Sequence, residues 1–141
     1  MVISLKMAKV LLEASEKKAK EMGLSENIAI VDEGGNLKGF LRMDNTKFGG
    51  IEIAIDKAWT SVAMQMPTSN LAEAAQPGGP SYGINTTNEG RIVVLGGGVP
   101  LVYNQKIVGG IGVSGATSAQ DIEVANAAVS VFEAMVQRQH Q

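Results

Sequence analysis

Few side chains in this sequence can do chemistry. The chain has no cysteine, and its single histidine, His140, is the second-last of 141 residues. Terminal residues are usually held loosely, so His140 is a poor candidate for a general base or a metal ligand. The lack of cysteine excludes disulfides, thiolate metal sites and cysteine nucleophiles. Carboxylates, basic groups, hydroxyls and methionine thioethers are the groups that remain.

Five acidic residues gather around a predicted hairpin and the helix that follows it. They are Asp32, Glu33, Asp44, Glu52 and Asp56. Paired carboxylates can transfer protons or hold a hard cation, but turn formation and a solvated helix face also explain these positions. An enzyme that uses Asp32, Asp44 or Asp56 as a general acid or base would need one carboxylate with a raised pKa in a dry pocket.

Residues 110–115, Gly-Ile-Gly-Val-Ser-Gly, match the G-x-G-x-x-G pattern of dinucleotide-binding loops. That fingerprint also requires a parallel strand after the next helix, and no residues remain for one. Ser114 lacks the final glycine of the G-x-S-x-G nucleophile motif and has no internal histidine to act as its base. We therefore interpret these glycines as positions where another backbone or a flat ligand approaches the sheet edge.

The charge and hydropathy of the chain exclude further classes of function. Twelve basic and 14 acidic residues give a formal net charge of -2, and no basic block could neutralise a run of phosphates, so nucleic acid is not an expected partner. No window approaches the roughly 18 consecutive apolar residues of a membrane span, and Lys6 and Lys9 interrupt the N-terminal stretch. We expect a cytoplasmic protein with one domain over residues 1–141.

The elements that must position any site follow from the hydrophobic periodicity. It predicts helices over 4–22, 48–66, 68–75 and 118–137, and strands over 27–32, 37–43, 91–95, 99–103 and 106–113. Ser4 is the expected N-cap of the first helix, and Ser118 with Asp121 forms an expected capping box for the last one. The stretch from 76 to 90 has no period, and loops of that kind are often functional.

The connections between the last three predicted strands are too short for parallel crossovers, so these strands must pair antiparallel. We therefore predict an α+β domain in the order α-β-β-α-α-β-β-β-α, with a five-stranded antiparallel sheet and helices on both faces.

Several short motifs, spread in order over nearly the whole chain, resemble one small family. They are Ile28–Asp32 with Gly35, Arg42–Asp44, Asp56–Thr60, Ala75–Gly78 with Tyr82-Gly83, Gly96–Leu101, and Gly109–Gly115 with Gln120-Asp121. On these residues the chain is identified as a member of the GlcG/HbpS-like family. This family includes haem-binding sensors, glycolate-operon proteins and the C-terminal domain of some corrinoid adenosyltransferases. The residues Lys57-Ala58-Trp59, within the Asp56–Thr60 motif, are most similar to those of family members encoded beside glycerol and propanediol dehydratases.

The resemblance implies a homo-oligomer, either a tetramer or an octamer, with haem or a corrinoid as the possible ligand. Some relatives bind haem through a histidine on an early helix, whereas this sequence has no histidine before position 140. Haem would then be held by apolar walls, by basic residues at the propionates, and by a Met, Thr or Tyr atom at the iron. The adenosyltransferase activity of the corrinoid relatives belongs to a different domain and is not expected here.

We predict a non-enzymatic homo-oligomer that binds haem or another tetrapyrrole or corrinoid, with no metal site formed by protein groups alone. The expected pocket lies between the 76–90 loop, the 96–100 turn and the 110–115 segment, with Arg42 and Lys57 as polar anchors. The residues expected to bind the cofactor are Arg42, Met43, Lys57, Tyr82, Gly97, Gly98, Gly112 and Ser114. The alternative is a ligand-free accessory or scaffold protein of a cobalamin-dependent glycerol or diol dehydratase pathway.

Overall fold

The computed structural model describes residues 1–139, so His140 lies outside the described residues. The helices are α1 (Leu5–Glu21), α2 (Gly50–Ala63), α3 (Thr68–Ala74) and α4 (Ser118–Gln139). The strands are β1 (Asn27–Asp32), β2 (Leu37–Arg42), β3 (Gly98–Tyr103) and β4 (Lys106–Ser114). Two short 3₁₀ turns, η1 (Ile84–Thr86) and η2 (Asn88–Gly90), lie between α3 and β3.

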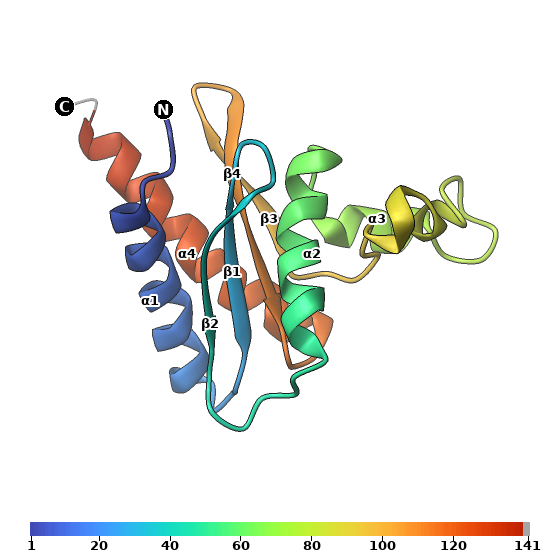
Figure 1. The fold of residues 1–141 in the computed structure, drawn as a ribbon, viewed down its shortest axis with the longest axis horizontal. Coiled ribbons are helices and arrows are strands. Elements are labelled where there is room, and N and C mark those ends of the chain that lie inside the picture. Colours follow the sequence, from blue (N-terminus) through green and yellow to red (C-terminus); the bar gives the residue numbers. More distant parts are fainter. Residues whose placement is uncertain (140–141) are drawn as a thin grey trace.

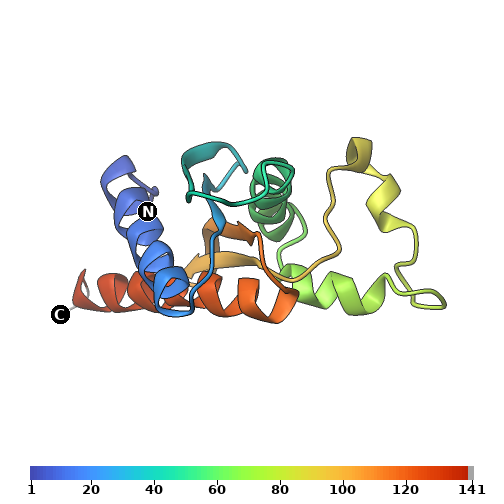
Figure 2. The ribbon, with the colours of Figure 1, turned by 90° about the horizontal axis from the view of Figure 1, so that it is seen from below.

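The four strands of residues 1–139 form one antiparallel sheet in the order β2-β1-β4-β3. Helices α1 and α4 lie side by side and cover one face of this sheet, while α2 crosses the other face (Figures 1 and 2). Strand β1 shows why both faces are buried. Ile28 and Ile30 enter the large core under α1 and α4, whereas Ala29 and Val31 enter a smaller cluster under α2.

The prediction of a fifth strand over residues 91–95 is wrong. That segment lies against α2, where the Thr60 hydroxyl donates to the Arg91 carbonyl oxygen (3.3 Å) and accepts from the Val93 N–H (3.1 Å). The Arg91 side chain bonds the Asp56 carboxylate (3.0 Å) and lies over the Trp59 ring, 4.5 Å from its centroid. Side chains of α2 therefore satisfy backbone groups that would otherwise bond to a neighbouring strand.

The ends of the first helix agree with the sequence prediction. The Ser4 hydroxyl accepts a hydrogen bond from the Met7 N–H (3.0 Å), and Gly23 follows the helix with a φ of 69°. A positive φ is inexpensive only for glycine, so the chain can reverse there without strain.

The capping box of α4 differs from the prediction by one residue. Thr117 is the N-cap: its hydroxyl accepts from the Gln120 N–H (3.2 Å), and the Gln120 side chain accepts from the Thr117 N–H (3.2 Å). Asp121 instead turns inward and accepts from the Ala116 N–H (3.0 Å). The helix still begins at Ser118 as expected.

Beyond α2 the chain leaves the sheet. In both ribbon views the segment containing α3, η1 and η2 extends sideways from the body formed by the sheet, α1 and α4 (Figures 1 and 2). Tyr82, in this segment, is 70% exposed. Across the described residues, no helix combines the length and apolar character needed to cross a bilayer.

Candidate functional site

Lys57, one of the two expected polar anchors, is an internal residue. Its side chain on α2 is only 2% exposed, and its Nζ atom donates to the Val113 carbonyl oxygen (2.8 Å) and to Asp121 Oδ2 (3.0 Å). The bond to Asp121 is a buried ion pair that ties α2 to the first turn of α4, and the bond to Val113 ties α2 to β4. Lys57 therefore holds the layers together and does not face a surface cavity.

A third titratable residue, Glu26, completes this buried cluster. Its side chain is fully buried, and neither carboxyl oxygen meets a hydrogen-bond donor among the described residues. Burial, together with the hydrogen bond to and the charge of the neighbouring Asp121 carboxylate, raises the pKa of Glu26 to about 9, although the Lys57 ammonium acts to lower it. Glu26 is therefore protonated at neutral pH, and the cluster holds one cation and one anion.

The three expected glycines, Gly97, Gly98 and Gly112, allow close packing around this cluster. A Cβ atom on Gly112 would overlap the Ala54 carbonyl oxygen of α2, and one on Gly98 would overlap the Lys57 carbonyl oxygen. A Cβ atom on Gly97 would lie 2.6 Å from the Val113 carbonyl oxygen and 2.9 Å from Lys57 Nζ. The backbone that approaches these glycines is therefore that of α2 and β4, so the space is filled by protein.

Arg42 and Met43 are the two expected residues that share an open cavity. This cavity, of about 470 Å³, is bordered by the end of α1 and the end of β2, and its lining residues are Glu16, Lys20, Gly23, Leu24, Ser25, Arg42, Met43, Asp44 and Asn45. The Met43 sulfur already accepts from the Glu26 N–H (3.4 Å), and Met43 packs against the main core. The lining of this cavity therefore contains two cationic side chains, two carboxylates and few apolar side chains.

The remaining expected residues lie elsewhere. Tyr82 belongs to the segment that projects from the sheet, and Ser114 borders a separate cavity of about 320 Å³ beside the start of α2. The structure therefore brings Lys57, Gly97, Gly98 and Gly112 together inside the protein and places Arg42 with Met43 at one surface. It does not bring these two groups and Tyr82 into a single pocket.

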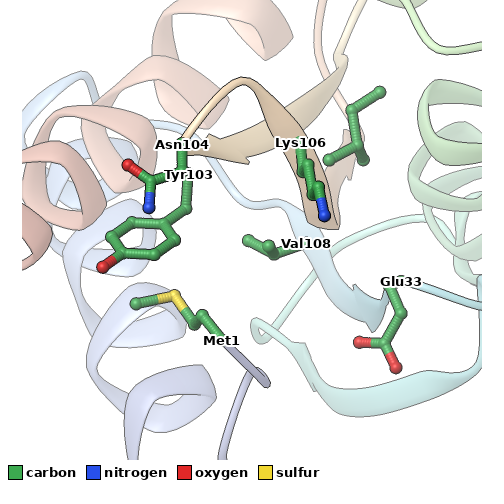
Figure 3. Close-up of a pocket in the computed structure, with 7 residues that line it drawn as sticks. Met1, Glu33, Tyr103, Asn104, Lys106 and Val108 are labelled. Carbon is green, nitrogen blue, oxygen red and sulfur yellow. The ribbon is translucent and has the colours of Figure 1, made fainter.

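A hollow at the opposite end of the sheet was not anticipated from the sequence. It measures about 430 Å³, and its lining residues are Met1, Glu33, Tyr103, Asn104, Lys106, Ile107 and Val108. Figure 3 shows the Tyr103 ring beside Met1 on one side, Lys106 and Glu33 on the other, and Val108 between them. A neighbouring hollow of about 390 Å³ shares Glu33, Lys106 and Ile107 and adds Val62, Gln65 and Gln105.

The β3–β4 hairpin positions this lining. Tyr103 and Lys106 are cross-strand partners on either side of a two-residue turn, Asn104-Gln105, whose φ angles of 51° and 64° fit a type I′ turn. A β-bulge then leaves Val108 out of register, and its side chain is 6% exposed. The sequence did contain a signal, because Tyr103 ends one predicted strand and Lys106 begins the next.

Within residues 1–139, no group of three or more histidine, cysteine, aspartate or glutamate side chains is placed so that it could hold a metal ion.

Sequence comparison identifies relatives over most of the chain. A family model described as "Haem degrading protein HbpS-like" matches residues 3–130. An uncharacterized 15.0 kDa protein from the dhaT-dhaS intergenic region of Citrobacter freundii is 38% identical over 130 residues, which are 92% of each chain. The corrinoid adenosyltransferase PduO of the same organism is 35% identical over 122 residues, 86% of this chain but 36% of PduO.

Solved structures agree with this relationship. The structure of a PduOC:heme complex superposes with a TM-score of 0.88 at 32% identity and covers 92% of this chain and 94% of that one. The HbpS crystal structure superposes with a TM-score of 0.84 at 30% identity and covers 93% and 90% of the two chains. Together with the family model, which spans most of the sequence, these matches show that the chain belongs to the HbpS-like family.

Proposed function

We propose that this protein is a non-enzymatic homo-oligomer that binds haem. The observation that carries the proposal is the likeness to the PduOC:heme complex, which extends over 92% of this chain at 32% identity. The description of the matching family also refers to haem. A chain that folds in the same way over nearly its whole length can provide the same kind of surface for a flat, mostly apolar ligand.

The donor groups of this chain fit haem in a particular way. No histidine lies before position 140, so we propose a sulfur or an oxygen atom from the body of the domain as the iron ligand. Methionine thioethers and tyrosine phenolates both ligate haem iron in proteins. Bound haem would supply iron-centred chemistry, and the chain's own residues would bind and orient the macrocycle.

The test is a titration of the protein with ferric haem, followed by visible absorbance, with cobalamin titrated in parallel because one relative is a corrinoid adenosyltransferase. The proposal expects a saturable Soret shift with haem. The absence of a shift with haem would contradict it, and a response to cobalamin alone would assign the site to a corrinoid.

The proposal of a binding protein differs from what the family description says, which is haem degradation. We expect the Soret band of the loaded protein to persist when ascorbate is added in air, with the decay of free haem measured as the control. Rapid loss of the band with release of iron would instead indicate an enzyme.

The homo-oligomer is proposed from the apolar surface of the single chain. Phe48 is 79% exposed, Tyr82 70% and Leu95 49%, and Tyr82 lies on the projecting segment. Large exposed apolar side chains are typical of surfaces that a second copy covers. Light scattering at micromolar concentration would contradict this part of the proposal if it gave the mass of one chain.

An accessory protein without a ligand is the second candidate. It is favoured by the relative at 38% identity, whose name places it in the dhaT-dhaS intergenic region and gives no activity. Affinity purification with products of neighbouring genes would favour this candidate if a specific partner were recovered while haem caused no spectral change.

A further inference from the structure

We propose that the cavity at the start of α2 binds the anionic head group of a small molecule, a carboxylate or a phosphate, through Lys47, the Ser114 hydroxyl and the first turn of the helix. The cavity measures about 320 Å³ and is bordered by the loop before α2, that first turn and the end of β4. This volume is at the lower end of the range of about 300–1,000 Å³ that is usual for ligand pockets. Ile53 and Ala116 give the lining an apolar side for the body of the ligand. The site is separate from the proposed haem binding and does not depend on it.

Ser114 provides a buried polar group that lacks a partner. Its side chain lines the cavity, is only 7% exposed, and forms no hydrogen bond through its hydroxyl within residues 1–139. A Cβ atom on Gly50 would lie 3.2 Å from Ser114 Oγ, so the hydroxyl is directly beside the first residue of α2. A buried hydroxyl that has lost its hydrogen bonds to water is costly, and a ligand oxygen that accepts from it recovers that cost.

The first turn of α2 supplies positive potential at the same place. Its N-cap is Gly49, which has no side chain to accept a hydrogen bond from the helix. The N–H groups of the first two helical residues donate to carbonyl oxygens of the preceding loop (3.0 Å each). The positive end of the helix dipole is therefore left without a capping side chain, and helix ends of this kind attract anions.

A single buried amide holds the two polar residues of the cavity in place. The Asn27 side chain is fully buried, and its Nδ2 atom donates to the Lys47 carbonyl oxygen (3.1 Å) and to the Ser114 carbonyl oxygen (3.3 Å). It thereby ties the loop before α2 to the end of β4. A site whose parts are fixed before binding loses less conformational entropy when the ligand arrives.

The charges around the cavity favour an anion. Lys47 is exposed and takes part in none of the ion pairs found in residues 1–139. Of the two buried carboxyl groups behind the wall, Asp121 is paired with Lys57 at 3.0 Å, and the raised pKa of Glu26 keeps that group protonated at neutral pH. Glu52, the acidic residue of the first turn, borders a different cavity. The ammonium of Lys47 is therefore the uncompensated charge at this site.

The experiment is isothermal titration calorimetry of the full chain, without haem, using sodium butyrate and sodium phosphate as separate probes at constant ionic strength. Ser114→Ala removes the hydroxyl, and Lys47→Gln removes the cation from an exposed position. Ser81→Ala and Lys106→Gln are matched controls at a serine and a lysine outside the cavity. Circular dichroism checks that each variant is folded, and the exposed position of Lys47 keeps the test decisive if Ser114→Ala does not fold.

We expect at least one of the two anions to bind the wild type with a Kd of about 10 mM or tighter. Ser114→Ala should weaken that binding about tenfold, because it removes a hydrogen bond to a charged group. Lys47→Gln should weaken it about two- to fivefold, as is usual for an exposed ion pair, and both controls should match the wild type. Binding of one anion only would support the site and identify its head group as a carboxylate or a phosphate.

Two results would overturn this site. One is the absence of binding by either anion up to about 10 mM. The other is binding that Ser114→Ala and Lys47→Gln leave at the wild-type affinity, which would place the anion elsewhere on the chain. Neither result bears on the haem titration, so the failure of this site and the failure of the proposed function are distinguishable.

Discussion

The buried Glu26 carboxyl makes a quantitative prediction about stability. Its pKa is raised from an ordinary 4.5 to about 9 in the folded chain, so between these values the folded state holds a proton that the unfolded state has released. The stability that this proton contributes is fully present below pH 4.5 and is lost as the pH rises toward 9. The expected slope is about 1.4 kcal/mol per pH unit, or about 3 kcal/mol between pH 6 and pH 8.

Glu26→Gln replaces the neutral carboxyl by an amide of nearly the same shape that does not titrate. The variant should therefore lose less stability than the wild type as the pH rises, and the difference between them should grow by about 3 kcal/mol from pH 6 to pH 8. Urea unfolding followed by circular dichroism at each pH measures this difference. Glu13→Gln, at an exposed position on α1, is the control and should follow the wild type.

Parallel stability curves for the wild type and Glu26→Gln would contradict a protonated Glu26 in the folded protein. They would mean that Glu26 is ionised in the folded protein at neutral pH and has a partner that compensates its charge.

Three further changes test the packing around the site, each by urea unfolding. Lys57→Met leaves its buried carboxylate partner without a cation and should cost about 3–5 kcal/mol; a cost below about 1 kcal/mol would mean that the pair is solvated. Gly112→Ala forces a methyl group against α2 and should cost about 1–3 kcal/mol or more, whereas Gly49→Ala, where a Cβ meets nothing within 4 Å, should be nearly neutral. Thr117→Ala should cost about 1 kcal/mol and Ser118→Ala much less, and the reverse order would restore the capping box expected from the sequence.

Local signals in the sequence were sufficient for most elements of the fold. The Ser4 cap, the stop at Gly23 and the turn at Asn104-Gln105 depend on residues that are near neighbours in the chain. The prediction of a strand over residues 91–95 was wrong because a segment that packs on a helix can show the same apolar pattern as a strand. What decides between the two is the Thr60 hydroxyl, about 30 positions away, which no local pattern reveals.

The candidate site was harder to predict for the same reason. Lys57 and Asp121 are 64 residues apart, so the sequence shows a lysine on a helix and gives no sign that it is buried against a carboxylate. The sequence indicates that a backbone or a flat ligand approaches the glycines of residues 110–115, but only the fold shows that backbone of α2 lies against Gly112, and that α2 and β4 also lie against Gly97 and Gly98. Tyr103 was seen only as a strand end, since its place beside Met1 depends on how the hairpin meets the start of the chain.

Native mass spectrometry of the protein after incubation with ferric haem is the decisive test of a haem-binding homo-oligomer, because one spectrum gives both the assembly and its ligand. We predict an assembly of several chains that carries additional mass in whole haem units, at about one haem per subunit or per subunit pair. A single chain, or an assembly whose mass does not change with haem, would contradict it.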